Sequence, residues 1–161
     1  MESVERKMAD RFQKNRDSVM LKKAENQIRV LVVEDHQISQ KIAQLVLKGL
    51  TCEVDIAKNG TEALELFNLN TYNLIFMDIG LPDMNGLTLT TKIRSQEKIL
   101  NLPPIPIVGL TAHKQMRLQI IEAGMNDFLL KPLTKENCLA VLNQFVLDKE
   151  VWPKELVQTA Y

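Results

Sequence analysis

Four short apolar segments of this chain each end in charged or hydroxyl residues. They span residues 30–35, 74–78, 107–111 and 127–132. Continuous apolar runs are typical of parallel strands that are buried on both faces. In an open α/β sheet, the residues that follow such strands meet at the carboxyl edge, where ligands bind. The sequence therefore predicts one crevice that collects three carboxylates, a hydroxyl and an ammonium group. These groups belong to Glu34, Asp35, Asp78, Thr111 and Lys131.

Length and composition favour one globular domain with short extensions. The chain has 161 residues, of which 45% are hydrophobic and 25% charged. Its 20 basic and 20 acidic residues cancel, so we expect no nucleic-acid partner. No apolar run approaches the roughly 18 residues that cross a bilayer, and the charged amino terminus is unlike a signal peptide. We expect a cytoplasmic protein without direct membrane contact, in which the isolated Cys52 and Cys138 are reduced core thiols.

The composition divides the chain into three parts. Residues 1–27 form a charged extension, residues 28–147 a domain, and residues 148–161 a tail too short for a second domain. Four apolar residues of the extension fall near one helical face and predict a helix: Val4, Met8, Phe12 and Val19. This helix would dock on the domain, pair with a second copy in a dimer, or be the remnant of a linker; a loosely ordered extension is the alternative.

Strands and helices alternate from Ile28 onward, which indicates βαβ units on a parallel sheet. We expect strands at residues 28–33, 53–57, 73–77, 105–110 and 127–130. We expect helices that begin near His36, at Asn59, near Leu87, near residue 114 and after Thr134. Five such units with right-handed crossovers leave few topologies.

Local signals refine these helices. Asp35 is the predicted N-cap of the first helix, which carries an apolar stripe made of Ile38, Ile42, Leu45, Val46 and Gly49. Asn59 and Glu62 predict a capping box for the second helix, and Gly124 predicts a left-handed end for the fourth. The last helix is expected to turn four residues inward: Leu139, Leu142, Phe145 and Val146.

The three carboxylates at the predicted edge point to a divalent cation. Hard cations such as Mg²⁺ take oxygen ligands, and carboxylates crowded together without a cation would repel one another. Glu34 and Asp35 are adjacent in sequence, and Asp78 ends the neighbouring strand. We therefore expect Mg²⁺ or Mn²⁺ at this edge. The alternative for Glu34 and Asp35 alone is that the pair simply caps a helix.

Residues 77–86 read Met-Asp-Ile-Gly-Leu-Pro-Asp-Met-Asn-Gly. This loop resembles the phosphoacceptor loop of the receiver domains of two-component response regulators, and the resemblance extends over residues 28–147. Residues 32–35, 78–84 and 122–127 are most similar to the receivers of hybrid sensor histidine kinases. The resemblance implies an α/β flavodoxin-like (βα)5 fold, a doubly wound five-stranded parallel sheet in the order 2-1-3-4-5.

The resemblance also implies the chemistry. Asp78 would be the phosphoacceptor, because a carboxylate can attack phosphorus and form an acyl phosphate. The metal ligands would be Glu34, Asp35, Asp78 and the backbone carbonyl of Gly80. Lys131, followed by a cis peptide bond to Pro132, and Thr111 would contact the phosphoryl group, together with the backbone N–H of Ala112. The protein would catalyse its own phosphorylation and dephosphorylation, and would otherwise not be an enzyme.

Two further sets of residues follow from the same resemblance. Thr111 and Phe128 would form the conformational switch, with His113 at the rim of the site. Ile38, flanked by Gln37 and Lys41, would lie on a partner surface. The partner would be a histidine kinase, a histidine phosphotransfer protein, or both in turn. The phosphoryl group would come from a phosphohistidine and would alter interactions between proteins.

Three other readings compete with a functional receiver. A degenerate receiver would act only as a protein-binding adaptor, but every site position is filled. A small aspartyl-phosphate phosphatase of the haloacid-dehalogenase type would need a second Asp two residues after the nucleophile, where Gly80 stands. A nucleotide-binding protein would need a glycine-rich loop after the first strand, and Glu34, Asp35 and His36 stand there instead.

Overall fold

The computed structural model describes residues 27–147. The helix expected within residues 1–27 falls almost entirely outside the described residues, as does the tail 148–161. Among residues 27–147, no helix combines the length and the apolar character needed to cross a bilayer.

The described residues form a five-stranded parallel sheet in the order β2-β1-β3-β4-β5, as predicted. The strands are β1 (Arg29–Val33), β2 (Glu53–Ala57), β3 (Leu74–Asp78), β4 (Ile107–Thr111) and β5 (Asp127–Leu130). The fourth strand begins two residues later than predicted, after the prolines, and extends to include Thr111. Pro cannot donate to a strand ladder, so the proline-rich entry at residues 103–106 stays outside the sheet.

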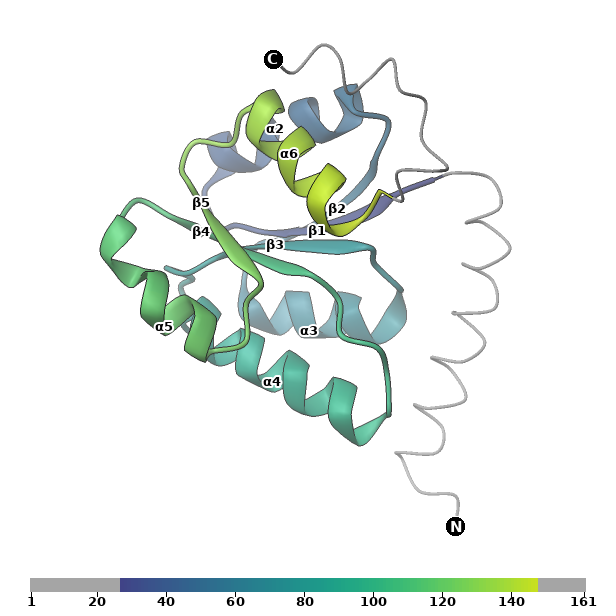
Figure 1. Cartoon of the computed structure of the whole chain (residues 1–161), viewed down its shortest axis with the longest axis vertical. Coiled ribbons are helices and arrows are strands. Elements are labelled where there is room, and N and C mark those ends of the chain that lie inside the picture. The colour runs from purple at the N-terminus through teal and green to yellow at the C-terminus, as the bar shows by residue number, and fades with distance from the viewer. Residues whose placement is uncertain (1–26, 148–161) are drawn as a thin grey trace.

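Helices cover both faces of the sheet (Figure 1), with α2 and α6 on one face and α3, α4 and α5 on the other. They are α2 (Gln37–Gly49), α3 (Gly60–Leu69), α4 (Gly86–Ile99), α5 (Arg117–Glu122) and α6 (Lys135–Phe145). A 3-10 turn, η1 (Lys114–Met116), precedes α5, so the fourth predicted helix is α-helical only in its second part. The central strands β3 and β4 are buried along their whole length.

Alternate strand residues feed two separate cores. On one face Leu31 and Met77 pack with the α3–α5 layer, and on the other Val32 and Phe76 pack with the α2 and α6 layer. Because successive strand side chains point to opposite faces, a sheet covered on both sides requires the continuous apolar runs seen in the sequence.

Three residues of the apolar stripe predicted on α2 are exposed: Leu45, Gly49 and Ile38, the last of which was also assigned to the partner surface. Leu45 is 75% exposed, and Gly49 is also exposed, whereas Ala43 and Leu47 are fully buried against the sheet. Ala43 and Leu47 lie one turn apart, and both pack in the core between α2 and the sheet. The predicted stripe left out both Ala43 and Leu47, so the expected inward face was rotated toward Leu45 and Gly49.

The start of α2 also differs from the prediction. His36 rather than Asp35 is the N-cap, and the His36 side chain makes no capping bond. Instead, a carboxylate oxygen of Glu34 accepts the His36 backbone N–H at 3.1 Å. The acidic pair therefore does not act as a side-chain cap through Asp35, which leaves the Asp35 carboxylate exposed at the sheet edge.

Other local signals are confirmed, except that the capping box of α3 is only half formed. Asn59 accepts the N–H of Glu62 at 2.8 Å, while the Glu62 carboxylate takes the N–H of Lys58 rather than that of Asn59. Gly124 has φ +99°, which ends the fourth helical segment as expected. In the last helix Leu139 and Leu142 are buried, whereas Phe145 and Val146 are half-buried.

Cys52 and Cys138 are free and buried in the core, in agreement with the prediction that they are reduced thiols. Burial raises the pKa of the Cys52 thiol to about 11 and that of Cys138 to about 12. Both side chains therefore serve as small neutral core residues at physiological pH.

Candidate functional site

The register of the sheet brings the predicted residues together at its carboxyl edge. Val33 pairs with Met77, so Glu34 and Asp78 follow side by side. Leu110 pairs with Asp78, which places Thr111 on the next strand, one residue beyond Leu110. Thr111 in turn pairs with Leu130, and Lys131 is the next residue along the chain. Four of the five strands, β1, β3, β4 and β5, thus deliver a polar residue to one edge.

Three carboxylates form a compact cluster at this edge. The oxygen atoms of Glu34, Asp35 and Asp78 lie within 4.8 Å of one another. Glu34 is only 2% exposed and Asp78 only 6%, whereas Asp35 is open to solvent. A concentration of hard anionic oxygens with one open side fits a divalent cation of the Mg²⁺ type, which keeps several of its waters.

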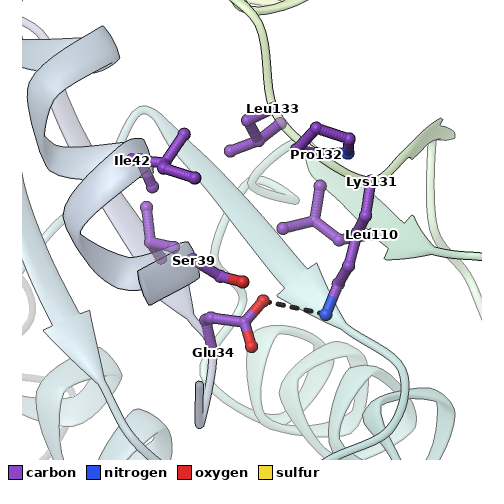
Figure 2. Close-up of a pocket in the computed structure, with 9 residues that line it drawn as sticks. Glu34, Ser39, Ile42, Leu110, Lys131, Pro132 and Leu133 are labelled. Atoms are coloured by element: carbon purple, nitrogen blue, oxygen red, sulfur yellow. Dashed lines mark ion pairs between the residues drawn. The ribbon is translucent and has the colours of Figure 1, made fainter. Parts of the chain in front are cut away.

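Lys131 lies directly against this cluster. Its Nζ is 2.9 Å from Glu34 Oε2 and 2.9 Å from Asp78 Oδ2. The peptide bond between Lys131 and Pro132 is cis, as expected. Figure 2 shows the side chain reaching from the end of β5 across to Glu34, with the ion pair marked. One ammonium group therefore faces two carboxylates.

The ionisation of Glu34 and Lys131 reflects this crowding. Burial raises the pKa of the Glu34 carboxyl, helped by the charge of Asp78, and outweighs the opposing effect of Lys131. Burial alone would lower the pKa of Lys131, but its hydrogen bonds to Glu34 and Asp78 together raise it. The positive charge of Lys131 is balanced by two carboxylates, whereas the negative charge of the buried Glu34 is not fully balanced. A bound cation would stabilise the Glu34 carboxylate.

A small cavity lies beside the buried Glu34 carboxylate. It has a volume of about 60 Å³ and lies between α2 and the segment that follows β5. Figure 2 shows Ile42, Leu110 and Leu133 around it, with Glu34 and Lys131 at one end and Ser39 beside Glu34. Apart from Ser39, the cavity residues on that side are apolar, so the Glu34 carboxylate relies on Lys131 and on the His36 N–H for its polar contacts.

The loop after Asp78 is held against the site by its backbone. The Gly80 N–H donates to Asp78 Oδ1 at 3.1 Å, and the Gly86 N–H donates to the carbonyl of Ile79 at 2.8 Å. A Cβ on Gly86 would clash with the backbone oxygen of Asp78, so this close approach requires glycine. Gly80 is exposed, which leaves its backbone open on the solvent side of the loop.

The expected switch residues occupy two environments. The Thr111 hydroxyl is buried, accepts the N–H of His113 at 3.0 Å, and lies 3.9 Å from Met116 Sδ. Phe128 pairs with Gly109 on the neighbouring strand and is half-buried against the α3–α5 core. Ala112 and His113 are both exposed at the rim. Thr111 thus lies one residue beyond Leu110, the sheet partner of Asp78, and its hydroxyl is bound to the segment that enters η1.

The expected partner surface is exposed at the start of α2. Ile38 is 64% exposed, and Gln37 and Lys41 beside it are exposed as well. Leu45, two turns further along α2, is an additional exposed apolar residue that the sequence analysis placed in the core. The sequence analysis also missed a set of hydrogen bonds from Asp83 to the N-terminus of α3. No local pattern signals them, because the partners are 22 and 23 residues apart in sequence.

Comparisons with known proteins agree on one family. Residues 30–143 match the model of the response regulator receiver domain. Hybrid signal transduction histidine kinase L of Dictyostelium discoideum is 36% identical over 122 residues, which cover 73% of this chain but only 7% of that kinase. The matched region is therefore a small part of that much longer relative.

Two solved structures are similar in both fold and sequence. The Saccharomyces cerevisiae receiver domain of Ssk1, crystallised with the histidine phosphotransfer protein Ypd1, has a TM-score of 0.70 and 33% identity, covering 74% of this chain and 88% of that chain. The receiver domain of the sensor histidine kinase PA1611 from Pseudomonas aeruginosa PAO1, with magnesium coordinated in its active-site cleft, has a TM-score of 0.65 and 31% identity, covering 73% and 96%. Together with the five-stranded fold and the acidic edge, these matches show that the chain belongs to the response regulator receiver domain family.

Proposed function

We propose that Asp78 accepts a phosphoryl group from a phosphohistidine of a partner protein, and that this switches the protein's interactions. The observation that carries the proposal is the pairing of the buried Asp78 carboxylate with Lys131 at 2.9 Å, beside Glu34 and Asp35. Receiver domains are phospho-accepting signalling domains, and this chain retains the acid cluster, the hydroxyl and the ammonium group that such a transfer uses.

In the proposed reaction a carboxylate oxygen of Asp78 forms a bond to phosphorus. The phosphorus–nitrogen bond of the donor breaks, and its electron pair stays on the imidazole of the donor histidine. Lys131 neutralises charge on the phosphoryl oxygens as they approach, and the Ala112 N–H and Thr111 hydroxyl supply hydrogen bonds. Catalysis of this kind consists mainly of positioning and of charge neutralisation.

Glu34, Asp35, Asp78 and the carbonyl of Gly80 would hold the cation. When bound, Mg²⁺ or Mn²⁺ neutralises negative charge on the phosphoryl group and on the carboxylates. The donor set consists only of oxygens, which fits a hard cation, and the buried Glu34 carboxylate needs a positive neighbour. Lys131 provides one such charge, and a divalent cation would provide two more.

The phosphorylated state would be reset by attack of water on the acyl phosphate, so the domain would catalyse both steps on itself. His113 is exposed next to Thr111 and would affect the access of water, while Gly80 has no side chain to shield the phosphorus. We propose a histidine kinase or a histidine phosphotransfer protein as the partner. The similar yeast receiver in complex with Ypd1 supports this choice. Reduced thiols at Cys52 and Cys138 are compatible with a location in the cytoplasm.

Phosphorylation with a small donor tests the proposal directly. The full chain is incubated with acetyl phosphate and MgCl₂, and its intact mass is followed over time. We expect the addition of one phosphoryl group, no reaction in EDTA, and no reaction in Asp78→Asn, which keeps the shape of the side chain but lacks the carboxylate nucleophile. Phosphorylation of Asp78→Asn at the wild-type rate would show that the acceptor lies elsewhere.

A further inference from the structure

The carboxylate of Asp83 binds the N-terminus of a helix from another part of the chain. Asp83 Oδ1 accepts the N–H of Gly60 at 2.8 Å. Its Oδ2 accepts both the N–H and the hydroxyl of Thr61 at 2.9 Å. Asp83 lies in the loop between β3 and α4, whereas Gly60 and Thr61 open α3. The bond from Gly60, together with those from Thr61, lowers the pKa of Asp83 to about 2, so the carboxylate stays ionised.

A second contact joins the loop between β3 and α4 to the N-terminus of α3. The Met84 side chain packs so closely on Gly60 that a Cβ there would lie 2.5 Å from Met84 Cγ. Glycine at position 60 therefore makes the space that Met84 occupies. The loop is thus held at its base by the Gly86 backbone and at its far end by Asp83 and Met84. Gly80 lies between Ile79, whose carbonyl accepts the Gly86 N–H at the base, and Asp83 at the far end.

The N-terminus of α3, which Asp83 binds, is also connected to the segment after β1 that carries Glu34 and Asp35. Only Lys58 and Asn59 separate α3 from Ala57, the last residue of β2. The carbonyl of Ala57 accepts the backbone N–H of Glu34 at 2.9 Å. The side-chain hydrogen bonds of Asp83 to the N-terminus of α3, the short segment back to Ala57, and the backbone hydrogen bond between Glu34 and Ala57 therefore connect Asp83 to the segment that carries the Glu34 and Asp35 carboxylates.

We propose that Asp83 is a positioning residue that sets the spacing between the Gly80 carbonyl and the β1–α2 carboxylates, and thereby the cation affinity of the site. The inference rests on the proposed function, since it concerns the same cation. Both Asp83 oxygens are engaged with α3, so Asp83 acts through the loop rather than as a ligand. Without it, part of the free energy of cation binding would be spent on ordering the loop.

The test compares Asp83→Ala with the matched variant Asn59→Ala in the full chain. Asn59→Ala removes a cap from the same end of α3, since Asn59 accepts the Glu62 N–H at 2.8 Å, but Asn59 lies outside the loop that carries Gly80. The Mg²⁺ dissociation constant is measured from amide chemical shifts during titration with MgCl₂. We expect Asp83→Ala to weaken Mg²⁺ binding about tenfold, the lower end of the effect of outer-shell partners. Asn59→Ala should leave the constant unchanged.

A second readout separates positioning from damage to the fold. At saturating MgCl₂, the maximal rate of phosphorylation of Asp83→Ala by acetyl phosphate should equal that of the wild type, because the side chains at the site are intact. Unchanged Mg²⁺ affinity in Asp83→Ala overturns the inference. Equal weakening in Asn59→Ala also overturns it, since the loss then comes from the stability of α3.

If Asp83→Ala does not fold, Asp83→Asn decides the question. It keeps one acceptor oxygen for α3, so its Mg²⁺ affinity should be lower than that of the wild type, and an unchanged affinity overturns the inference. A wild-type protein that binds no Mg²⁺ contradicts the proposed function itself, and the inference with it. A failure of the proposed function is thereby distinguished from a failure of the role assigned to Asp83 alone.

Discussion

Lys131 Nζ lies 2.9 Å from Asp78 Oδ2, at the carboxyl edge of the sheet. This is the carboxylate to which the phosphoryl group is proposed to bind. The same nitrogen is equally close to Glu34, so the ammonium bridges the acceptor and a cation ligand. An incoming phosphoryl group would therefore meet a positive charge that is already in place. Such preorganised charge lowers the cost of reorganisation during the reaction.

We expect Lys131→Ala to slow phosphorylation by acetyl phosphate about 100-fold, the scale seen when one preorganised donor to a developing anion is removed. The measurement is the initial rate of mass gain at fixed MgCl₂. Lys135→Ala is the control, because this substitution removes the same charge from the chain, but at an exposed residue at the start of α6. A wild-type rate in Lys131→Ala would show that the ammonium does not act on the phosphoryl group.

Glu34 should make the cation-free protein less stable as the pH rises. Because its pKa is raised above the ordinary value of 4.5 in the folded state, the folded protein binds more protons than the unfolded chain just above that pH. The free energy of unfolding therefore falls as the pH rises through this window. In EDTA at neutral pH, Glu34→Gln should have a higher melting temperature than the wild type, since Gln has no buried charge.

In MgCl₂ the wild type should have a higher melting temperature than Glu34→Gln, the reverse of the order in EDTA. The wild type should gain melting temperature from Mg²⁺, because a ligand that binds only the folded state stabilises it, whereas Glu34→Gln lacks one anionic oxygen donor and should gain less. Thermal melts between pH 5 and pH 7, with EDTA or with MgCl₂, measure both effects. A wild-type protein whose stability in EDTA increases over this range relative to Glu34→Gln would contradict the raised pKa.

Much of the fold and site followed from the sequence because both depend on strand ends. Continuous apolar runs predicted buried parallel strands, and the residue after each run was bound to lie at one edge of the sheet. The inward face of α2 did not follow, because burial of Ala43 depends on how closely the helix approaches the sheet. The role of Asp83 did not follow either, since its partners Gly60 and Thr61 become neighbours only after folding.

Thr111→Ala should separate phosphorylation from its structural consequence. The Thr111 hydroxyl accepts the His113 N–H at 3.0 Å, and a phosphoryl group on Asp78 would compete for that hydroxyl. Thr111→Ala keeps Asp78, the proposed phosphoacceptor, and should still be phosphorylated. The amide shift changes that accompany phosphorylation in η1, α5 and β5 should be much smaller than in the wild type. Thr91→Ala, in an exposed part of α4, is the control, and full wild-type changes in Thr111→Ala would refute the coupling.

Docking of the phosphohistidine donor should depend on the exposed face of α2. Ile38 is 64% exposed next to the acidic edge, and Leu45 lies two turns further along the same helix at 75% exposure. Residues seven apart share one helical face, so the two side chains form an apolar strip flanked by polar residues. An exposed apolar patch rimmed by polar residues is typical of a site of protein–protein interaction.

Ile38→Asp should slow transfer from a phosphorylated histidine phosphotransfer protein about tenfold or more, the effect of losing one interface hot spot. Phosphorylation by acetyl phosphate should be unchanged, because that small donor needs no docking surface. Leu118→Asp is the matched control: Leu118 is 68% exposed, but it lies on α5, across the sheet from α2 (Figure 1). Equal loss of both phosphorylation routes in Ile38→Asp would indicate a damaged site. Equal slowing of protein-to-protein transfer in Leu118→Asp would place the docking surface elsewhere.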